Sequence, residues 1–294
     1  MRLITVFTPT YNRAFCLNQL YESLIVQTNK DFIWLIIDDG STDGTTELIR
    51  TWQNENKLEI HYVFQENQGM HGAHNTAYQN ITTELNVCID SDDYMPHDAI
   101  EKILKIWKEK GSDVLAGIIG LDSFKDGAIV GSTIPQNIEI STLNELYSVH
   151  KVTGDKKMVL RTDVVKQFPP YPIYKGEKLV PLGTLYLMIG TKYKCICSNE
   201  VFCIVEYLED GSSKNILKQY IKSPRGFGYS RIVTMRLSNS LSVQFKAAIH
   251  LVSSALFARS IKLFFQSPNL VISILAIPFG FLLTGYIIFK TRNI

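Results

Sequence analysis

Short apolar runs alternate with amphipathic segments over the first 120 residues of the chain. Continuous runs rich in β-branched and aromatic residues are typical of buried parallel strands, whereas apolar side chains three or four positions apart indicate helices. The pattern predicts strands at 3–8, 32–37, 58–64, 85–89 and 114–121. It predicts helices at 14–27, 42–55, 71–79 and 96–110. Because alternating strands and helices form βαβ units, we expect an α/β fold with a mostly parallel sheet flanked by helices.

The pattern is less regular from residue 122 onward. It predicts short strands at 128–131, 158–161, 195–197 and 201–206, and helices at 142–150, 162–167 and 178–189. The turn-forming sequence Asp-Gly-Ser-Ser at 210–213 indicates a boundary. We therefore divide the chain into a first domain, 1–213, with halves 1–120 and 121–213, and a C-terminal region, 214–294.

Polar turns follow three of the predicted strands, at 8–13, 38–44 and 90–93. Ligands of open α/β sheets bind at the carboxyl ends of the strands. Because the carboxyl ends of parallel strands meet at one edge of a sheet, the three turns predict a single binding site there.

Asp90 and Asp92 stand two residues apart where a predicted strand runs into a turn. Two such carboxylates can share one hard cation with oxygen ligands, Mg²⁺ or Mn²⁺, and that cation commonly holds a diphosphate as well. The alternative is that Asp93 or a neighbour caps the helix predicted near Pro96.

Two other turns carry groups that suit a nucleotide. Asp39 could accept hydrogen bonds from a base or ribose, and Tyr11 offers a ring for stacking, although an Asx-turn and simple packing explain them as well. In the loop 67–75, glycines such as Gly69 would let backbone N–H groups approach a diphosphate at a helix N-terminus. The alternative for this segment is that it is simply a flexible loop.

Charge is distributed unevenly along the 294 residues. The net charge is only +2, but no Asp or Glu follows Asp210, and residues 214–294 carry eleven of the 30 Lys and Arg. Such a basic region indicates an anionic partner, either nucleic acid or lipid. Because 269–289 is apolar and uncharged, we expect lipid and no nucleic acid.

The sequence gives little support to several other kinds of site. There is no Gly-x-Gly-x-x-Gly after a strand and no Walker-type loop, so dinucleotide redox and P-loop chemistry lose support. The five cysteines are an odd, scattered set, and with no secretory leader they suit a reducing cytosol better than a disulfide framework. The group Cys195, Cys197 and Cys203 lacks a second ligand pair at zinc spacing.

The order and spacing of these turns closely resemble those of family 2 glycosyltransferases. The turns that carry the resemblance are Pro9-Thr10-Tyr11-Asn12-Arg13, Asp38-Asp39-Gly40-Ser41-Thr42-Asp43-Gly44-Thr45, Asn67-Gln68-Gly69 and Asp90-Ser91-Asp92-Asp93. The resemblance is strong over 3–120 and weaker at 154–156 and 176–178, which look like the acceptor half of bacterial polysaccharide members. It implies a GT-A (Rossmann-like) fold and an inverting transfer of sugar from a nucleotide-diphosphate donor, UDP-linked by resemblance alone, to a glycan or lipid-linked acceptor.

The resemblance also implies roles for individual residues. Asp39 would contact the base, Asp90 would lie near the ribose, and Asp92 would bind the Mg²⁺ or Mn²⁺ that bridges the diphosphate. The nucleotide-sugar contacts would come from Thr8, Pro9, Tyr11, Arg13, Asp39, Gly69, Asp90 and Ser91.

Inverting transfer needs a base on the acceptor hydroxyl and charge stabilisation on the leaving diphosphate. Many members of the family have a Glu-Asp pair whose Asp takes the acceptor proton, but the corresponding place here reads Glu177-Lys178. We assign the catalytic base to Glu177, with Asp155 as the substitute candidate. A Glu favoured by the dipole at the start of a predicted helix explains Glu177 equally well.

Two other functions stay open. A sugar nucleotidyltransferase also uses paired Asp residues and a metal on an α/β sheet, but it usually has a Gly-rich, basic turn after its first strand. A non-catalytic membrane scaffold is the second alternative. Intact carboxylates at Asp39, Asp90, Asp92 and Glu177 argue against the scaffold.

The C-terminal region indicates membrane association. Segment 269–289 is long enough to span a hydrocarbon core of roughly 30 Å, but Pro278 and Gly280 interrupt it, and positive residues flank it on both sides. Segment 240–265 suits an apolar helix that lies in the interface. We expect a kinked or re-entrant C-terminal segment that holds the enzyme at the cytoplasmic face of the cell membrane, peripherally or as an anchor. The alternative is a buried helical pair in a soluble enzyme.

Overall fold

A computed structural model describes residues 2–206 and 216–292. The boundary expected at 210–213 therefore lies outside the described residues. The chain forms two compact units, one of Met1–Pro170 with Lys192–Leu208 and one of Tyr171–Thr191 with Glu209–Ile294.

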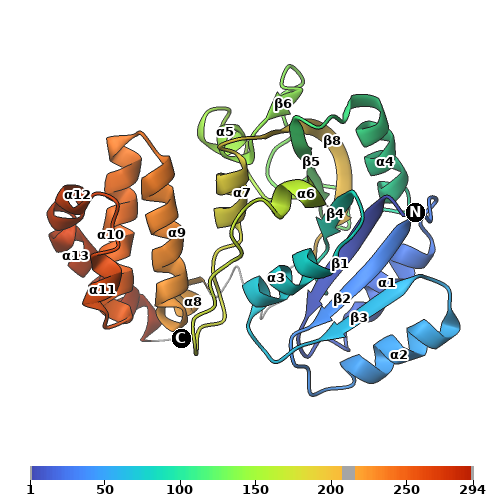
Figure 1. Ribbon diagram of the computed structural model, residues 1–294, viewed down its shortest axis with the longest axis horizontal. Helices are drawn as coiled ribbons and strands as arrows, with labels where there is room; N and C mark the ends of the chain where they lie inside the picture. The colour runs from blue at the N-terminus through green and yellow to red at the C-terminus, as the bar shows by residue number, and fades with distance from the viewer. Residues whose placement is uncertain (1, 207–215, 293–294) are drawn as a thin grey trace. The chain divides into compact units, whose positions relative to one another are not determined.

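The first unit is built on one mixed sheet, whose strands in the described residues follow the order β3-β2-β1-β4-β7-β5-β8-β6 (Figure 1). The neighbours β1–β2, β1–β4, β2–β3 and β5–β8 are parallel, whereas β7 is antiparallel to both β4 and β5, and β6 to β8. The strands are β1 Ile4–Thr10, β2 Phe32–Asp38, β3 Ile60–Phe64, β4 Leu85–Cys88, β5 Leu115–Ser123, β6 Ile140–Ser141, β7 Lys156–Arg161 and β8 Lys194–Ile204.

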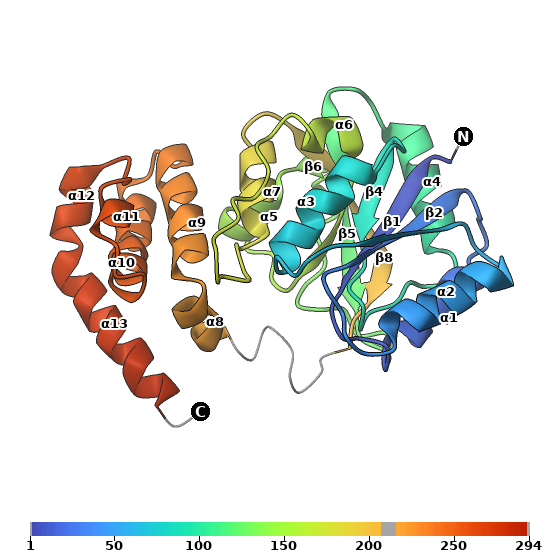
Figure 2. The same cartoon turned by 60° about the horizontal axis from the view of Figure 1, so that its bottom comes forward.

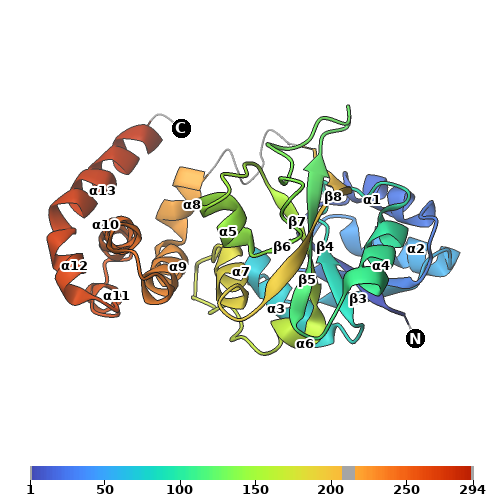
Figure 3. The same ribbon diagram turned by 90° about the horizontal axis from the view of Figure 1, so that it is seen from above.

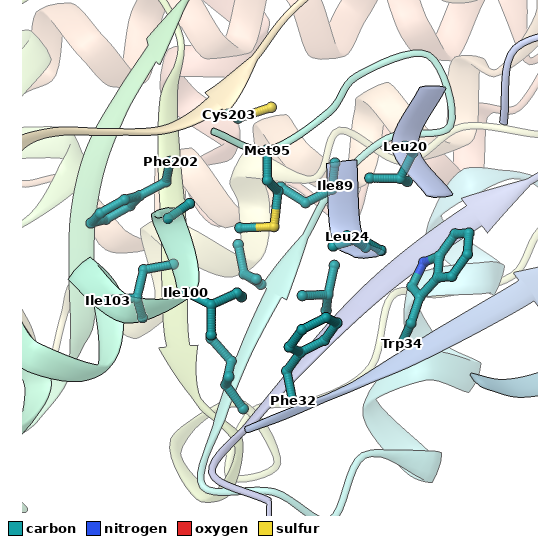
Figure 4. Packing of buried hydrophobic residues seen from close by; sticks show 14 of the residues in the cluster. Leu20, Leu24, Phe32, Trp34, Ile89, Met95, Ile100, Ile103, Phe202 and Cys203 are labelled. Carbon is teal, nitrogen blue, oxygen red and sulfur yellow. The ribbon is translucent and has the colours of Figure 1, made fainter. Parts of the chain in front are cut away.

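Helices cover both faces of this sheet, with α1, α2 and α4 on one face and α3 on the other (Figure 3). Alternate strand residues supply the two cores, because successive side chains point to opposite faces. Leu24 of α1, Phe32 of β2 and Ile100 of α4 share one cluster (Figure 4), whereas Phe7 packs edge-on against His74 and Tyr78 of α3. The helices are α1 Leu17–Ile25, α2 Thr45–Glu55, α3 Met70–Asn80, α4 Ala99–Lys110, α5 Leu143–Ser148 and α6 Thr162–Val165.

The expected α/β fold is confirmed, and the differences fall after residue 121. The strand expected at 128–131 is reduced to a single bridge between Ser123 and Ile129, and those expected at 195–197 and 201–206 form one strand, β8. The helix expected from residue 178 begins only at Gly183, because Pro181 disfavours helical backbone at the residue before it.

The second unit is helical, and α10 lies at its centre. Helix α9 packs on one side of α10, and α11, α12 and α13 form an arc around the other (Figures 2 and 3). Buried side chains such as Leu251 and Val252 of α10 fill the space between them. The helices are α7 Gly183–Ile189, α8 Ile216–Lys222, α9 Pro224–Leu237, α10 Leu241–Phe257, α11 Ile261–Phe264, α12 Leu270–Leu275 and α13 Ile277–Thr291.

The grouping of Tyr171–Thr191 with the C-terminal helices differs from the division expected at residue 213. The Glu177 carboxylate accepts hydrogen bonds from the backbone N–H groups of Arg225 (3.1 Å) and Gly226 (2.9 Å) in the first turn of α9. Gly226 itself lies so close to Leu179 that a Cβ there would be 2.0 Å from its carbonyl oxygen. These local contacts bind the segment to α9.

The long apolar segment 269–289 is not one helix. Its helices α12 and α13 meet at Ala276, and Pro278 stands in the first turn of α13, where a missing N–H costs no hydrogen bond. The expected interruption is therefore confirmed. Among the residues that the structure describes, no helix combines the length and the hydropathy needed to cross a membrane.

Two glycines of α13 provide a matched stability test. A Cβ at Gly280 would meet the Val252 side chain at 2.4 Å, whereas one at Gly285 would meet nothing within 4 Å. Gly280→Ala should therefore lower the stability of the helical unit by about 1–3 kcal/mol through overpacking. Gly285→Ala should leave it unchanged or raise it by up to about 1 kcal/mol. Thermal unfolding followed by circular dichroism measures both, and equal effects of the two variants would contradict the packing described.

Candidate active site

The turns that follow β1 and β2 are joined by hydrogen bonds at the carboxyl edge of the sheet. The Asp39 N–H donates to the Thr10 carbonyl (2.8 Å). The Asn12 N–H donates to the Ser41 hydroxyl (2.9 Å), and the Asn12 side-chain oxygen accepts from the Thr42 N–H (2.7 Å). Asn12 has a φ of 52°, a left-handed conformation that Asn tolerates better than most residues. The expected meeting of these two turns is confirmed.

A further contact fixes the start of α1 to the same edge. The Asp43 carboxylate accepts from the Ala14 N–H (3.1 Å) and from the Thr45 N–H (3.0 Å). Burial alone would raise the pKa of Asp43, but hydrogen bonds from the Thr45 hydroxyl and these N–H groups outweigh it and lower the pKa. Asp43 is thus held as an anion that links the two turns.

The buried Asp39 carboxylate organises the loop before α3. One oxygen accepts from the Gln65 side chain (2.6 Å) and the Gln68 N–H (2.8 Å), and the other accepts from the Gly69 N–H (2.7 Å). Gly69 has a φ of 83° and directly precedes the helix. The sequence predicted that N–H groups of this loop would meet a diphosphate. Those of Gln68 and Gly69 instead bind Asp39, because a helix N-terminus attracts an anion and the chain supplies its own.

The turn after β4 holds the carboxylates expected to bind a metal. Asp90 and Asp92 are half-buried and Ser91 is buried, and the Asp93 N–H closes the turn on the Asp90 carbonyl (3.1 Å). Asp93 does not cap a helix, because its carboxylate accepts from the Glu206 N–H (3.1 Å) and contacts the Cys203 thiol (3.7 Å). The alternative interpretation of Asp93 as a helix cap is therefore wrong.

Lys157 of β7 is a partly buried cation that sequence analysis missed. Its side chain is 14% exposed, and its Nζ lies 3.9 Å from Oδ1 of the buried Asp122. Burial lowers the pKa of Lys157, but Asp122, Cys203, Asp93 and Asp90 together raise it well above its usual range. Burial raises the pKa of Asp93 to about 7, and Lys157 opposes that rise. A Lys at the start of a strand gives no sequence signal, because it usually lies in solvent.

The residues expected around the nucleotide differ in exposure. The Tyr11 side chain is 49% exposed and open to a ligand. The Arg13 guanidinium lies over the Phe15 ring (5.6 Å), and Pro9 is buried within β1. The Thr8 hydroxyl is buried and accepts from the Trp34 indole N–H (3.0 Å), so this side chain also has a packing role.

The two candidate bases belong to different units. Asp155 is exposed and directly precedes β7 in the first unit. Because β7 is antiparallel to β4, Asp155 lies at the edge of the sheet where β4 ends. Glu177 belongs to the second unit, where both of its oxygens accept from α9.

The residues present suit a divalent metal that takes part of its ligands from a substrate. Among the described residues, no group of three or more His, Cys, Asp and Glu side chains is arranged to hold a metal ion. Asp90 and Asp92 nevertheless supply two hard oxygen donors at one strand end. Mg²⁺ is commonly held by one or two carboxylates together with substrate phosphates, so this pair fits such an ion.

A separate cavity of about 550 Å³ opens at the opposite edge of the sheet, where β4 begins and β7 ends. Its cations are already engaged, since Arg161 pairs with Asp163 (2.5 Å) and Lys166 donates to the Ile81 carbonyl (2.8 Å). The cavity lies away from the turns described above.

Comparison with known proteins identifies the relatives of this chain. The sequence model described as "Glycosyl transferase family 2" matches residues 5–168. Glycosyltransferase GlyA of Streptococcus pneumoniae is 34% identical over 114 residues, which are 39% of this chain and 16% of that protein. The chain spans only 15% to 43% of the length of eight such curated relatives.

Solved structures resemble the fold over most of the chain. Residues 1–349 of Staphylococcus aureus TarS in complex with UDP-GlcNAc align with a TM-score of 0.62 at 19% identity, over 93% of this chain and 79% of that one. The mannosyltransferase PcManGT of Pyrobaculum calidifontis, in complex with GDP-Man and Mn²⁺, aligns with a TM-score of 0.55 at 18% identity, over 97% and 84%. The expected GT-A fold is confirmed.

Asp39→Asn tests the role of the carboxylate in holding the loop. An amide has one acceptor oxygen, so its NH₂ group would face the Gln68 or the Gly69 N–H and leave it unsatisfied. An unsatisfied buried group costs about 1–3 kcal/mol, so the amide hydrogens of Gln68 and Gly69 should exchange about 10- to 100-fold faster. Hydrogen exchange measures this, with the exposed Asp113→Asn as the matched control. Unchanged exchange at Gln68 and Gly69 would show that Asp39 does not hold the loop.

Proposed function

The chain belongs to glycosyl transferase family 2, and we propose that it transfers a sugar from a UDP-linked donor to a glycan or lipid-linked acceptor. The reaction would invert the configuration at the anomeric carbon and would serve bacterial polysaccharide biosynthesis. The observation that carries the proposal is the gathering of the turns after β1, β2 and β4 at one sheet edge, within the matched residues. TarS, a poly(ribitol-phosphate) β-N-acetylglucosaminyltransferase by name, has been solved with UDP-GlcNAc and supports the choice of donor.

The nucleotide would lie over the turns of β1 and β2. Tyr11 is exposed enough to stack on a base, and aromatic rings stack on bases of any kind. Asp39 is 4% exposed, so we assign it mainly the task of fixing the 65–69 loop beside the base. Arg13 would lie beside the bound nucleotide, and Pro9 and Ser91, both buried, would support the turns from within the fold.

The diphosphate would lie over the end of β4. We propose that Asp92, with Asp90 beside it, holds a Mg²⁺ or Mn²⁺. The bound metal would stabilise the negative charge that develops on the leaving diphosphate. PcManGT, solved with Mn²⁺, supports this cofactor.

The base on the acceptor hydroxyl is the remaining role. Both Glu177 oxygens already accept from backbone N–H groups of α9. Asp155 is exposed at the sheet edge where β4 ends. We therefore favour Asp155 as the base and keep Glu177 as the alternative.

We also propose that the enzyme works at the cytoplasmic face of the cell membrane, where nucleotide sugars and a lipid-linked acceptor can meet. The basic, acid-free C-terminal region supports this location.

The product distinguishes the proposed reaction from its alternatives. The purified chain is incubated with UDP-GlcNAc or UDP-glucose and Mn²⁺, and the released species is identified. Nucleoside diphosphate supports sugar transfer or its slow hydrolytic side reaction. Release of pyrophosphate from a nucleoside triphosphate and a sugar phosphate, with formation of the nucleotide sugar, would indicate nucleotidyl chemistry. No product with either donor or with that pair would indicate a scaffold.

Asp92→Asn should remove most of the activity. The bound metal should stabilise the leaving group by several kcal/mol, and loss of a carboxylate ligand weakens binding of that metal. Turnover should therefore fall by several orders of magnitude. Mn²⁺ binding measured by calorimetry in the presence of UDP should weaken in parallel, whereas the exposed Asp126→Asn should change neither. Full turnover of the native enzyme in excess chelator would refute the metal role.

The two candidate bases are separated by a pair of variants. Asp155→Asn should reduce kcat by about 10²- to 10⁴-fold while KM for the donor stays unchanged, because only the proton transfer is lost. Glu177→Gln should mainly lower the melting temperature, because an amide cannot accept from both Arg225 and Gly226. If Glu177→Gln abolishes transfer at an unchanged melting temperature and Asp155→Asn transfers normally, Glu177 is the base.

A further inference from the structure

One face of α13 is buried against α10. A Cβ at Gly280 would meet Val252, so the two helices approach closely there. One turn later the Thr284 hydroxyl donates to the Ser253 hydroxyl (2.9 Å). Ile287 is buried in a cluster with Tyr220 and Phe227. Positions 280, 284 and 287 thus define the inner face of α13.

The opposite face of α13 is apolar and exposed. Leu282 is 71% exposed and Phe289 is 69% exposed, and Tyr286 lies between them at helical spacing. Phe281, directly before Leu282, is exposed as well. A helix on the surface of a globular protein normally carries polar residues there. The outer face of α13 is therefore built to be covered by something apolar.

The exposed apolar surface continues onto α12 and α11, which follow the same arc around α10 (Figure 3). Val271 is 70% exposed, and Ile274 and Leu275 are exposed beside it. We call this surface the outer arc. Its exposed apolar side chains are Ile261, Phe265, Val271, Ile274, Leu275, Phe281, Leu282, Tyr286 and Phe289.

Cations flank the outer arc at both ends. Arg259 and Lys262 are exposed at its start, and Lys290 and Arg292 are exposed at its end. No carboxylate side chain follows Asp210 in the sequence. The arc therefore combines apolar side chains with positive charge alone, which is the chemistry of a surface that meets anionic lipid.

We propose that the outer arc docks in the plane of an anionic bilayer, with its apolar side chains at the acyl boundary and its flanking cations at the headgroups. This inference rests on the proposed membrane location and specifies the surface that makes it. The 15 residues of α13 extend only roughly 22 Å, less than a hydrocarbon core of roughly 30 Å, which favours lying in the interface. A second copy of the chain is a poorer occupant, because pairing two arcs would bring like charges together.

Vesicle co-sedimentation of the full chain tests the proposal. We expect binding to vesicles of phosphatidylcholine with about one third phosphatidylglycerol, at least tenfold weaker binding to phosphatidylcholine alone, and weakening as salt is raised. Leu282→Ser combined with Phe289→Ser should reduce binding at least tenfold, and Lys262→Glu combined with Lys290→Glu should do the same. Val114→Ser, at a 70% exposed apolar residue of the first unit, is the matched control and should bind normally.

Two further measurements keep the test decisive. Circular dichroism should show unchanged melting for the Ser variants, because both side chains are exposed. In Leu282→Trp the added fluorescence should be quenched by brominated lipid in anionic vesicles. No quenching, or native binding by the double Ser variant, would overturn the proposal. The proposal would also be overturned if the double Ser variant bound vesicles normally but lost a dimer that the native chain forms in sedimentation velocity. That result would identify a second copy of the chain as the occupant.

Failure of this inference is distinguishable from failure of the proposed function. Release of nucleoside diphosphate from a soluble donor needs no membrane, so the double Ser variant should retain it. A chain that releases nucleoside diphosphate but binds no vesicle would overturn the docking surface alone. A chain that binds vesicles but releases nothing would leave the surface standing and refute the transfer reaction.

Discussion

The candidate site depends on one buried carboxylate at the end of β2. Asp39 accepts from the Gln65 side chain and from the N–H groups of Gln68 and Gly69, and its own N–H donates to β1 through Thr10. A helix N-terminus leaves backbone N–H groups unsatisfied and carries a partial positive charge, so a carboxylate placed there is strongly favoured. This one group therefore fixes the sheet edge, the 65–69 loop and the start of α3 relative to one another.

The same interaction recurs in the helical unit and changes how its acidic residue is interpreted. Glu177 binds the N–H groups of Arg225 and Gly226 at the start of α9. Both Asp39 and Glu177 look like ligand-binding or catalytic carboxylates in the sequence. Residue type alone does not separate the two roles, because a carboxylate that accepts from a substrate and one that accepts from a helix need the same oxygen atoms.

The order of the strands determines which charged side chains lie together near the end of β4. Because β7 runs antiparallel between β4 and β5, it brings Lys157 among the carboxylates at their ends. Asp122 lies 3.9 Å from its ammonium group. Burial raises the pKa of both Asp93 and Asp122, and the Lys157 ammonium opposes that rise at both carboxyl groups. Asp90, one half of the proposed metal pair, is close enough to Lys157 to interact with it electrostatically.

The sequence by itself determined the alternation of strands and helices to residue 121, the polar turns at the strand ends and the break before Pro278. These follow from local rules, namely side-chain periodicity, turn chemistry and the missing N–H of proline. Only the tertiary structure decided that β7 inserts between β4 and β5 and that 171–191 joins the C-terminal helices. It also decided that the Asp39 carboxylate binds the N–H groups at the start of α3 and that one face of α13 stays exposed. Each of these features depends on which distant segments of the chain pack together. The periodicity of side chains along a segment shows which face is buried but not which other segment covers it.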